Sequence, residues 1–151
     1  NPGFESGDYQ SGTDNWEAQS CTLQKVWKTF TRSGEQAIKV TNRTSPDASP
    51  IQNITSGLLE YGKGKYDVSV YARRRSGTDG ICICIRYSDE TGEHLVHTPY
   101  ANVSSEYTMI KGTLDLQWTG KLRSADIFVR TENDVTDDLF LDEFYCSKKG
   151  H

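Results

Sequence analysis

The chain has 151 residues, with 17 Lys and Arg against 21 Asp and Glu, which gives a formal net charge of −4 and a pI near 5.4. This charge excludes the broad basic surface that nucleic-acid binding needs. The mean hydropathy of −0.68 and the lack of an 18-residue apolar run exclude a membrane-spanning helix. The length suits one domain with one core, which we place at residues 1–146, followed by a polar linker or tail at 147–151.

Alternating apolar and polar residues predict a series of short strands. In chain order they are expected at residues 19–26, 37–41, 50–54, 65–73, 80–88, 107–114, 124–132 and 139–144. Turn sequences rich in Gly, Ser and Asp separate them, and no stretch keeps a 3.6-residue apolar period over three helical turns. This pattern predicts an all-β fold, namely a single antiparallel β-sandwich of the jelly-roll type.

Each strand of such a sandwich has a core side and an outer side. The outer positions of this chain hold both aromatic and long polar side chains: Tyr71, Arg73, Arg86, Phe128, Arg130 and Glu132. A solvated face without a ligand more often carries Thr, Ser, Lys and Glu. Scattered exposed apolar side chains are nevertheless normal on protein surfaces, so a plain solvated face stays an alternative.

The four cysteines are interpreted as structural. Cys82 and Cys84 stand two apart in a predicted strand, so they point to one face and cannot easily form a disulfide. Their C-x-C spacing also lacks the C-x2-C turn of a zinc site. Cys21 and Cys146 could form a disulfide if the first and last strands pair, with free thiols as the default.

Four sequence segments together resemble a β-jelly-roll carbohydrate-binding module of the group that includes families 4, 9, 16 and 22. They are "NPGFESG" followed by Trp16, "SGEQAIKVTNRT", "PIQNITSGLLEYGKGKYDVSVYAR" and "LFLDEF". Their order and spacing carry the resemblance, and "VTNRT" beside "PIQNIT" is most similar to family 22, the xylan-binding type. The resemblance implies a non-catalytic module that attaches a secreted plant-cell-wall-degrading enzyme to a β-linked polysaccharide, xylan first, then mixed-linkage β-glucan or glucomannan.

The resemblance also implies a secreted, extracellular protein of bacterial type, a covalently adjoining catalytic domain and a monomeric module. No nucleic acid or membrane is expected as a partner. The alternative is a jelly-roll module that has lost or altered its sugar affinity and acts as a spacer beside a catalytic domain.

A structural Ca2+ that ties the N-terminal segment to the last strand is a further implication of the resemblance. The matching ligand positions are Gly3, Glu5, Thr31, Gly34 and Asp142. Calcium prefers several oxygen ligands from carboxylates and backbone carbonyls. Asp142 interrupts an apolar strand, where a carboxylate needs a partner, although a surface acid at a strand end is the simpler alternative.

Sugar binding needs aromatic rings for the C–H face of a pyranose, and amide, carboxylate or guanidinium groups for its hydroxyls. The candidates are Gln19, Tyr71, Arg73, Arg86, Tyr100, Phe128, Arg130 and Glu132. Phe128 and Glu132 fall near an aromatic and an acidic ligand-binding position of family 22. Gln19 falls where those members usually keep an Arg. Residues 45–48, Ser-Pro-Asp-Ala, stand where they typically carry a ligand-stacking Trp, a loss of roughly 1–3 kcal/mol by analogy with base stacking.

A glycoside hydrolase would need two carboxylates about 5–10 Å apart across a cleft. The acids here cluster in turns or at strand ends, and Glu132 stands among arginines, which would lower its pKa and make it a poor general acid. His94 and His97 point to opposite faces of an extended segment and do not form a metal site. We therefore expect a binding module and not an enzyme.

Overall fold

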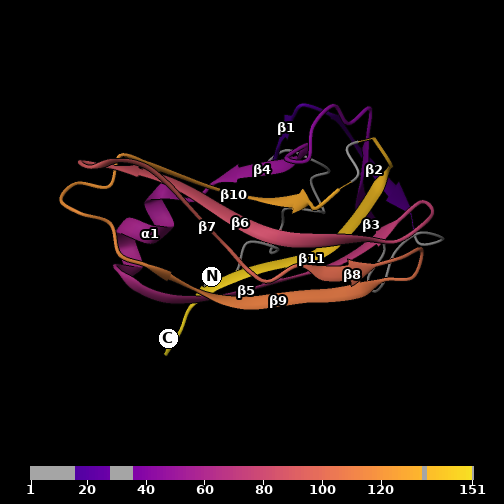
Figure 1. Ribbon diagram of the computed structural model, residues 1–151. Coiled ribbons are helices and arrows are strands. Elements are labelled where there is room, and N and C mark those ends of the chain that lie inside the picture. The colour runs from indigo at the N-terminus through magenta and orange to yellow at the C-terminus, as the bar shows by residue number, and fades with distance from the viewer. Residues whose placement is uncertain (1–15, 28–35, 134–135, 151) are drawn as a thin grey trace.

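The computed structural model describes residues 16–27, 36–133 and 136–150. Two antiparallel sheets face each other as two layers (Figure 1). Sheet I has the order β1 (Glu17–Gln19), β4 (Ser49–Asn53), β10 (Ser124–Thr131), β6 (Asp79–Asp89), β7 (Gly92–His97), and β8 (Ala101–Val103) also pairs with β6. Sheet II has the order β2 (Thr22–Trp27), β3 (Gln36–Thr41), β11 (Leu139–Lys148), β5 (Gly64–Arg74), β9 (Thr108–Leu116). The predicted antiparallel jelly-roll sandwich is confirmed.

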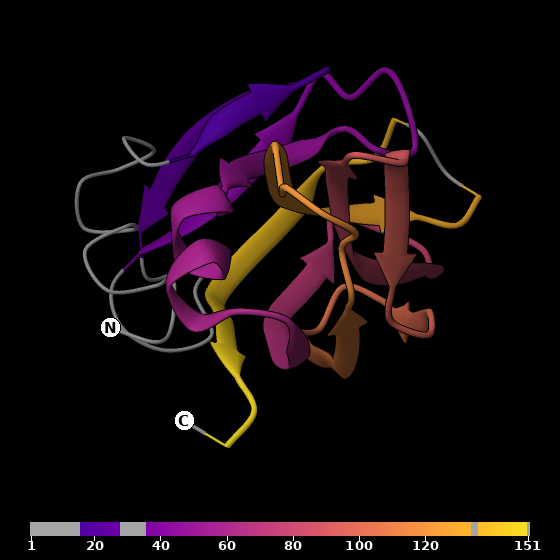
Figure 2. The same ribbon diagram turned by 90° about the vertical axis from the view of Figure 1, so that its left-hand side faces the viewer.

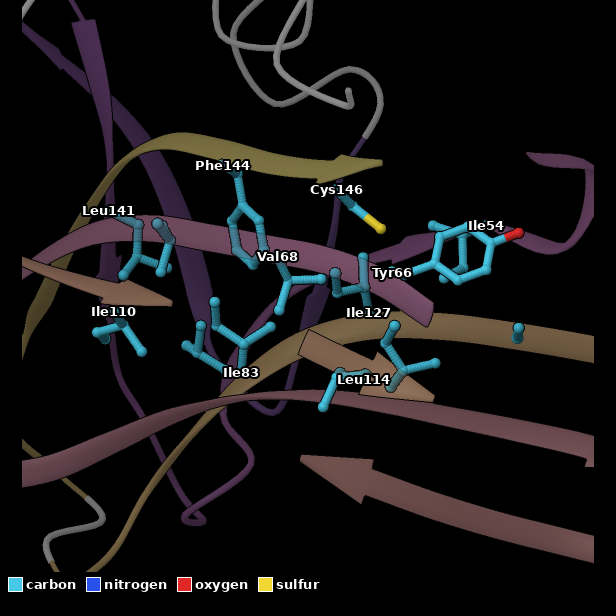
Figure 3. Packing of buried hydrophobic residues seen from close by; sticks show 14 of the residues in the cluster. Ile54, Tyr66, Val68, Ile83, Ile110, Leu114, Ile127, Leu141, Phe144 and Cys146 are labelled. Carbon is cyan, nitrogen blue, oxygen red and sulfur yellow. The ribbon is translucent and has the colours of Figure 1, made fainter. Parts of the chain in front are cut away.

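The core lies between the two sheets, where the inward positions of alternating strands meet. Figure 3 shows Val68, Ile110 and Leu141 from sheet II packed toward Ile83 and Ile127 from sheet I. All five side chains are buried. The predicted alternation is therefore correct, because successive strand residues point to opposite faces and only one set is apolar throughout.

The first predicted strand, at residues 19–26, is wrong as a single element. Ser20 has a left-handed backbone with φ of 58°, which ends β1 and lets the chain turn into β2. The two short strands then belong to different sheets, since β1 pairs with β4 and β2 pairs with β3. The chain thus crosses from one layer of the sandwich to the other at Ser20.

One helix, α1 (Thr55–Tyr61), follows β4 and was not predicted from the sequence. It lies at one end of the sandwich (Figure 2) and buries only Leu58, so it has too few apolar residues for a detectable helical period. Thr55 ties it to sheet I, because the Thr55 hydroxyl accepts the backbone N–H of Ala125 over 2.9 Å. In the described part of the chain, no helix has the length and apolar character to cross a membrane.

The last strand extends into the segment that was expected to be a linker or tail, residues 147–151. Strand β11 continues to Lys148, and Ser147 and Lys148 pair with Asp67 and Tyr66 of β5. Residues 147 and 148 therefore still belong to the last strand, because they have a neighbouring strand to bond.

All four cysteines are free thiols. Cys21 and Cys146 do not form the disulfide that the sequence left open, since the first and last strands do not pair: β11 lies between β3 and β5. Cys146 is buried in the core and Cys21 is half-buried against it.

Candidate functional site

The outer face of sheet I gathers most of the predicted sugar-binding residues. Phe128 of β10 lies opposite Cys84 of β6, and Arg130 lies opposite Cys82 in the same register. Directly opposed residues of antiparallel strands point to the same side of a sheet. Six of the eight predicted residues lie on this face or at its rim: Gln19, Arg86, Tyr100, Phe128, Arg130 and Glu132.

Tyr71 and Arg73 do not belong to this face, which corrects the prediction. Both are on β5 of sheet II and point to the other side of the sandwich. The Arg73 guanidinium lies over the ring of Phe140 at 4.0 Å, with Tyr107 on a second side at 5.9 Å. Alternation indicates that a residue points away from the core, but not which of the two sheets it belongs to. The prediction therefore combined residues from two opposite outer surfaces.

Phe128 is also not the exposed ring that the sequence predicted. Its side chain has no exposed surface and packs against Cys82 and Cys84. The Arg86 guanidinium covers the ring at 5.0 Å from its centroid. A sugar therefore cannot stack on Phe128 in this conformation, and the residue instead forms the support beneath the face.

The polar residues of the face are bonded to one another in a chain. Arg86 Nη2 donates to Gln19 Oε1 over 2.9 Å, and Gln19 Nε2 donates to the backbone carbonyl of Asp47 over 2.8 Å. The Asp47 carboxylate accepts Arg130 Nε over 2.6 Å, and this bond raises the pKa of Arg130 above its already high value. Gln19 thus bridges Arg86 to the loop that contains Asp47.

That loop, residues 44–48, is held in place by Arg43, whose side chain is buried. Arg43 Nε donates to the carbonyl of Ala48 over 3.0 Å, and Nη2 donates to the hydroxyl of Thr131 over 2.9 Å. The backbone N–H of Thr131 in turn donates to the carbonyl of Pro46 over 2.9 Å. The 44–48 loop, which has no aromatic residue, therefore packs on the end of β10. There the Asp47 carboxylate is bonded to Arg130.

Tyr100 and Glu132 are the other two predicted residues of this face. Tyr100 is half-buried with its ring 5.7 Å from that of His97, and Glu132 is exposed. Gly80 lets them come close over β6, since a Cβ there would lie 2.5 Å from Glu132 Oε1 and 3.1 Å from Tyr100 Cβ. The Glu132 backbone is fixed by its N–H donating to the Gly80 carbonyl over 2.8 Å. This pair offers one ring and one carboxylate to a ligand.

The buried Asp79 fixes the turn that follows β10. Its two carboxylate oxygens accept the backbone N–H and the side-chain Nδ2 of Asn133, each over 3.0 Å, and one also accepts the N–H of Gly80. Glu132 therefore lies between two residues with anchored backbones, Thr131 and Asn133. This limits the conformational freedom that the segment would lose on binding a ligand.

Two thiols lie in contact beneath the face. Cys82 Sγ and Cys84 Sγ are 3.7 Å apart, and both side chains are fully buried. The hydrogen bond with Cys84 lowers the pKa of Cys82, with Tyr100, His97 and Arg130 contributing in the same direction, whereas that bond and burial raise the pKa of Cys84. The sulfurs are not joined, in agreement with the predicted C-x-C geometry.

A groove runs along the β1 end of the same sheet, and of its residues only Gln19 was predicted from the sequence. It encloses about 640 Å3 and is lined by Glu17, Ala18, Gln19, Ile51, Gln52, Asn53 and Asp126. Asp126 precedes Phe128 by two positions on β10 and so shares its face, a signal that the sequence contained. Burial raises the pKa of Asp126, nearby Arg86 lowers it, and Glu17 raises it further.

The predicted calcium ligands can be located only in part. Gly3, Glu5, Thr31 and Gly34 lie outside the described residues. Asp142 is buried on β11, where its Oδ1 accepts the backbone N–H of Glu143 over 2.8 Å at a bulge in the strand. Within residues 16–27, 36–133 and 136–150, no group of three or more His, Cys, Asp or Glu side chains could hold a metal ion.

Comparisons with known proteins agree with this architecture. The family described as "Carbohydrate binding domain" matches residues 1–136. A search of curated proteins finds no match. Among solved structures, the chain is similar to the CBM22-1 and CBM22-2 xylan-binding domains of Paenibacillus barcinonensis Xyn10C. The first gives 17% identity over 89% of this chain and 86% of that chain with a TM-score of 0.74. The second gives 14% over 98% of both chains with a TM-score of 0.76.

A third similar structure is that of the CBM22-1-GH10 modules of Clostridium thermocellum xylanase 10B, complexed with xylohexaose. Its identity is 22% over 91% of this chain but only 26% of that longer chain, with a TM-score of 0.74. At such identities the likeness shows a shared fold.

Proposed function

Because the chain belongs to this family of carbohydrate-binding domains, we propose that it binds a xylan-type β-linked polysaccharide on the outer face of sheet I. The family match confirms the interpretation as a non-catalytic module. The observation that carries the proposed site is the meeting of Tyr100 and Glu132 over Gly80, beside Arg130. The ring and the carboxylate are groups that a pyranose can use.

The expected binding contacts follow from the exposed groups of the face. The ring of Tyr100 would take the C–H face of one sugar residue, which contributes about 1–3 kcal/mol by analogy with base stacking. The carboxylate of Glu132 would accept sugar hydroxyls, and a hydrogen bond to a charged group contributes about 1.5–3 kcal/mol. A single ring supports modest affinity, so we expect long chains to be bound better than short ones.

Xylan is the first polymer to test because three structurally similar proteins are named as xylan-binding domains or occur with xylohexaose. Mixed-linkage β-glucan and glucomannan are the next candidates, since their β-linked backbones present similar rings and hydroxyls. We also propose that a catalytic domain adjoins the module in a secreted protein, as the similar module from Clostridium thermocellum is joined to a GH10 module.

A spacer module with lost or altered sugar affinity is the second candidate function. Two observations favour it: Arg86 covers the ring of Phe128, and Asp47 occupies Arg130. Both remove groups that could otherwise contact a sugar. Residues 45–48 also contain no aromatic side chain.

Affinity electrophoresis through gels that contain xylan, mixed-linkage β-glucan or glucomannan separates the two functions. Retardation by xylan supports the binding function, and Glu132→Gln should then lower it. The change replaces a charged acceptor at an exposed position without altering its size. Unchanged migration of the wild-type protein on every polymer would favour the spacer.

A structural Ca2+ near Asp142 is part of the same proposal. Its support is that Asp142 is buried, while Oε2 of neighbouring Glu143 is buried without a hydrogen-bond partner among the described residues. A buried carboxylate oxygen without a partner, such as Glu143 Oε2, is costly, and carboxylate oxygens are ligands that Ca2+ prefers.

Thermal unfolding with Ca2+ and with a chelator tests the ion. An ion bound only by the folded state at 100 times its dissociation constant adds about 2.7 kcal/mol of stability. We expect the melting temperature to fall on chelation in the wild type and to be insensitive in Asp142→Asn. Equal melting temperatures of the wild type with and without Ca2+ would refute the ion.

A further inference from the structure

The groove at the β1 end of sheet I has the layout of a sugar subsite. Of the sugar-binding residues predicted from the sequence, only Gln19 lines it. Its floor includes Ile51, which packs on Phe128 and its neighbours and is only partly buried. Around this apolar floor lie the carboxylates of Glu17 and Asp126 and the amides of Gln19 and Asn53. An apolar floor with a polar rim matches a pyranose, whose C–H face and hydroxyls need different partners.

The strand register places these groups around one point of the sheet. Glu17 of β1 lies opposite Ile51 of β4. One step along, Asn53 of β4 lies opposite Asp126 of β10, and Asp126 in turn lies opposite Arg86 of β6. The subsite is therefore built from three adjacent strands, and it is contiguous with the face that holds Arg86.

The rim residues differ in how far their hydrogen-bonding groups are already used. The amide oxygen of Gln19 accepts from Arg86, and its amide nitrogen donates to the Asp47 carbonyl. In Asn53 the side-chain oxygen accepts the N–H of Thr55 over 2.9 Å, which leaves its Nδ2 as a donor. The carboxylates of Glu17 and Asp126 form no hydrogen bond or ion pair with the described residues. The groove thus offers acceptors at two positions and a donor at a third.

We propose that this groove is an additional subsite for a neutral sugar residue of the polysaccharide, with Glu17 and Asp126 as hydroxyl acceptors and Asn53 as donor. The inference rests on the proposed function, because it extends the same face by one subsite. It also assigns a selectivity: two carboxylates face one guanidinium, Arg86, which already donates to Gln19. A uronate group placed here would meet like charge, so the subsite favours undecorated chain over chain bearing acidic side groups.

Calorimetric titration tests the subsite with two probes, namely xylohexaose and a xylo-oligosaccharide of equal length that carries one glucuronate. The variant is Glu17→Gln with Asp126→Asn, which keeps both side-chain sizes and removes both charges. The matched control is Glu106→Gln, an exposed carboxylate between β8 and β9, neither of which lines the groove. A urea melt of each variant verifies that it is folded.

We expect the double variant to bind xylohexaose about three- to tenfold more weakly, the range for losing one or two hydrogen bonds to a ligand. Its preference for the neutral over the glucuronate-bearing probe should fall at least threefold, while Glu106→Gln changes neither value. If the double variant matches the wild type on both probes while Glu132→Gln still weakens binding, the subsite is wrong and the proposed function stands. If the wild type binds neither probe, both are wrong.

Discussion

Arg130 Nε donates to Asp47 Oδ1 over 2.6 Å, although the two residues lie 83 positions apart in the chain. This contact joins the 44–48 loop to β10 of sheet I and holds an acid where members of the family that the chain resembles typically carry a ligand-stacking Trp. The loop is therefore part of the sugar face through its polar groups. Residues 45–48 add no aromatic ring to the half-buried Tyr100.

The position of the loop depends on Arg43, so Arg43→Lys should unfold more easily. Lysine cannot reproduce the forked donation to Ala48 and Thr131, and buried carbonyls would lose their donors. We expect a loss of about 2–4 kcal/mol in the free energy of unfolding, measured by urea denaturation. Arg75→Lys is the control, because the side chain of Arg75 is 64% exposed and its change should cost less than about 0.5 kcal/mol. Equal midpoints for the two variants would contradict the anchoring role.

Phe128 and Tyr100 should respond differently to truncation. Phe128→Ala removes a fully buried ring and should cost about 3–5 kcal/mol of stability. Tyr100→Ala removes a half-buried ring and should mainly weaken sugar binding, by about tenfold for a stacking contact. The volume-tolerant Phe128→Leu separates the roles: it should keep its affinity, and a stable Phe128→Leu protein without affinity would show that the ring touches the sugar.

The acid sensitivity of the fold should depend on Asp89, which joins the β6–β7 turn to the loop after β9. The backbone N–H of Thr119 and the hydroxyl of Thr91 donate to its carboxylate and hold its pKa well below the ordinary value. A folded-state pKa below the unfolded value of about 3.9 stabilises the fold above that pH, and the stabilisation is lost as the pH falls further.

The measurement is the melting temperature of the wild type and of Asp89→Asn between pH 6 and pH 2.5. The variant should melt lower at pH 6, and the difference should shrink as the pH falls below 4. Asp115→Asn, at an exposed position on β9, serves as the control with no such convergence. A difference between wild type and Asp89→Asn that stays constant over the whole range would rule out this role of Asp89.

The sequence predicted the strand faces well because alternation is a local property. Val68 and Val70 point inward and Tyr71 and Arg73 outward, as their spacing indicates. Which outer face each strand contributes to depends on strand order, and this is why Tyr71 was grouped with residues from the opposite side of the sandwich. Strand order is set by pairing between distant segments, which a local pattern does not report.

The site was predictable as a set of residue types but not as a set of roles. The alternation of the strand placed Phe128 on the outer face. Its burial, however, depends on Arg86 lying over the ring, and a hydrogen bond to Gln19 holds Arg86 there. Asp126 and Glu17 were missed because polar residues near a strand end carry no pattern of their own. Their significance comes from the groove that three strands form together.

The most direct test of the binding face compares two tyrosines on opposite sides of the sandwich. Xylohexaose is titrated calorimetrically into the wild type, Tyr100→Ala on the sheet I side and Tyr71→Ala on the sheet II side. We predict measurable binding by the wild type, a loss of about tenfold or more for Tyr100→Ala, and unchanged affinity for Tyr71→Ala. Retained affinity in Tyr100→Ala together with its loss in Tyr71→Ala would place the sugar on sheet II and contradict the account.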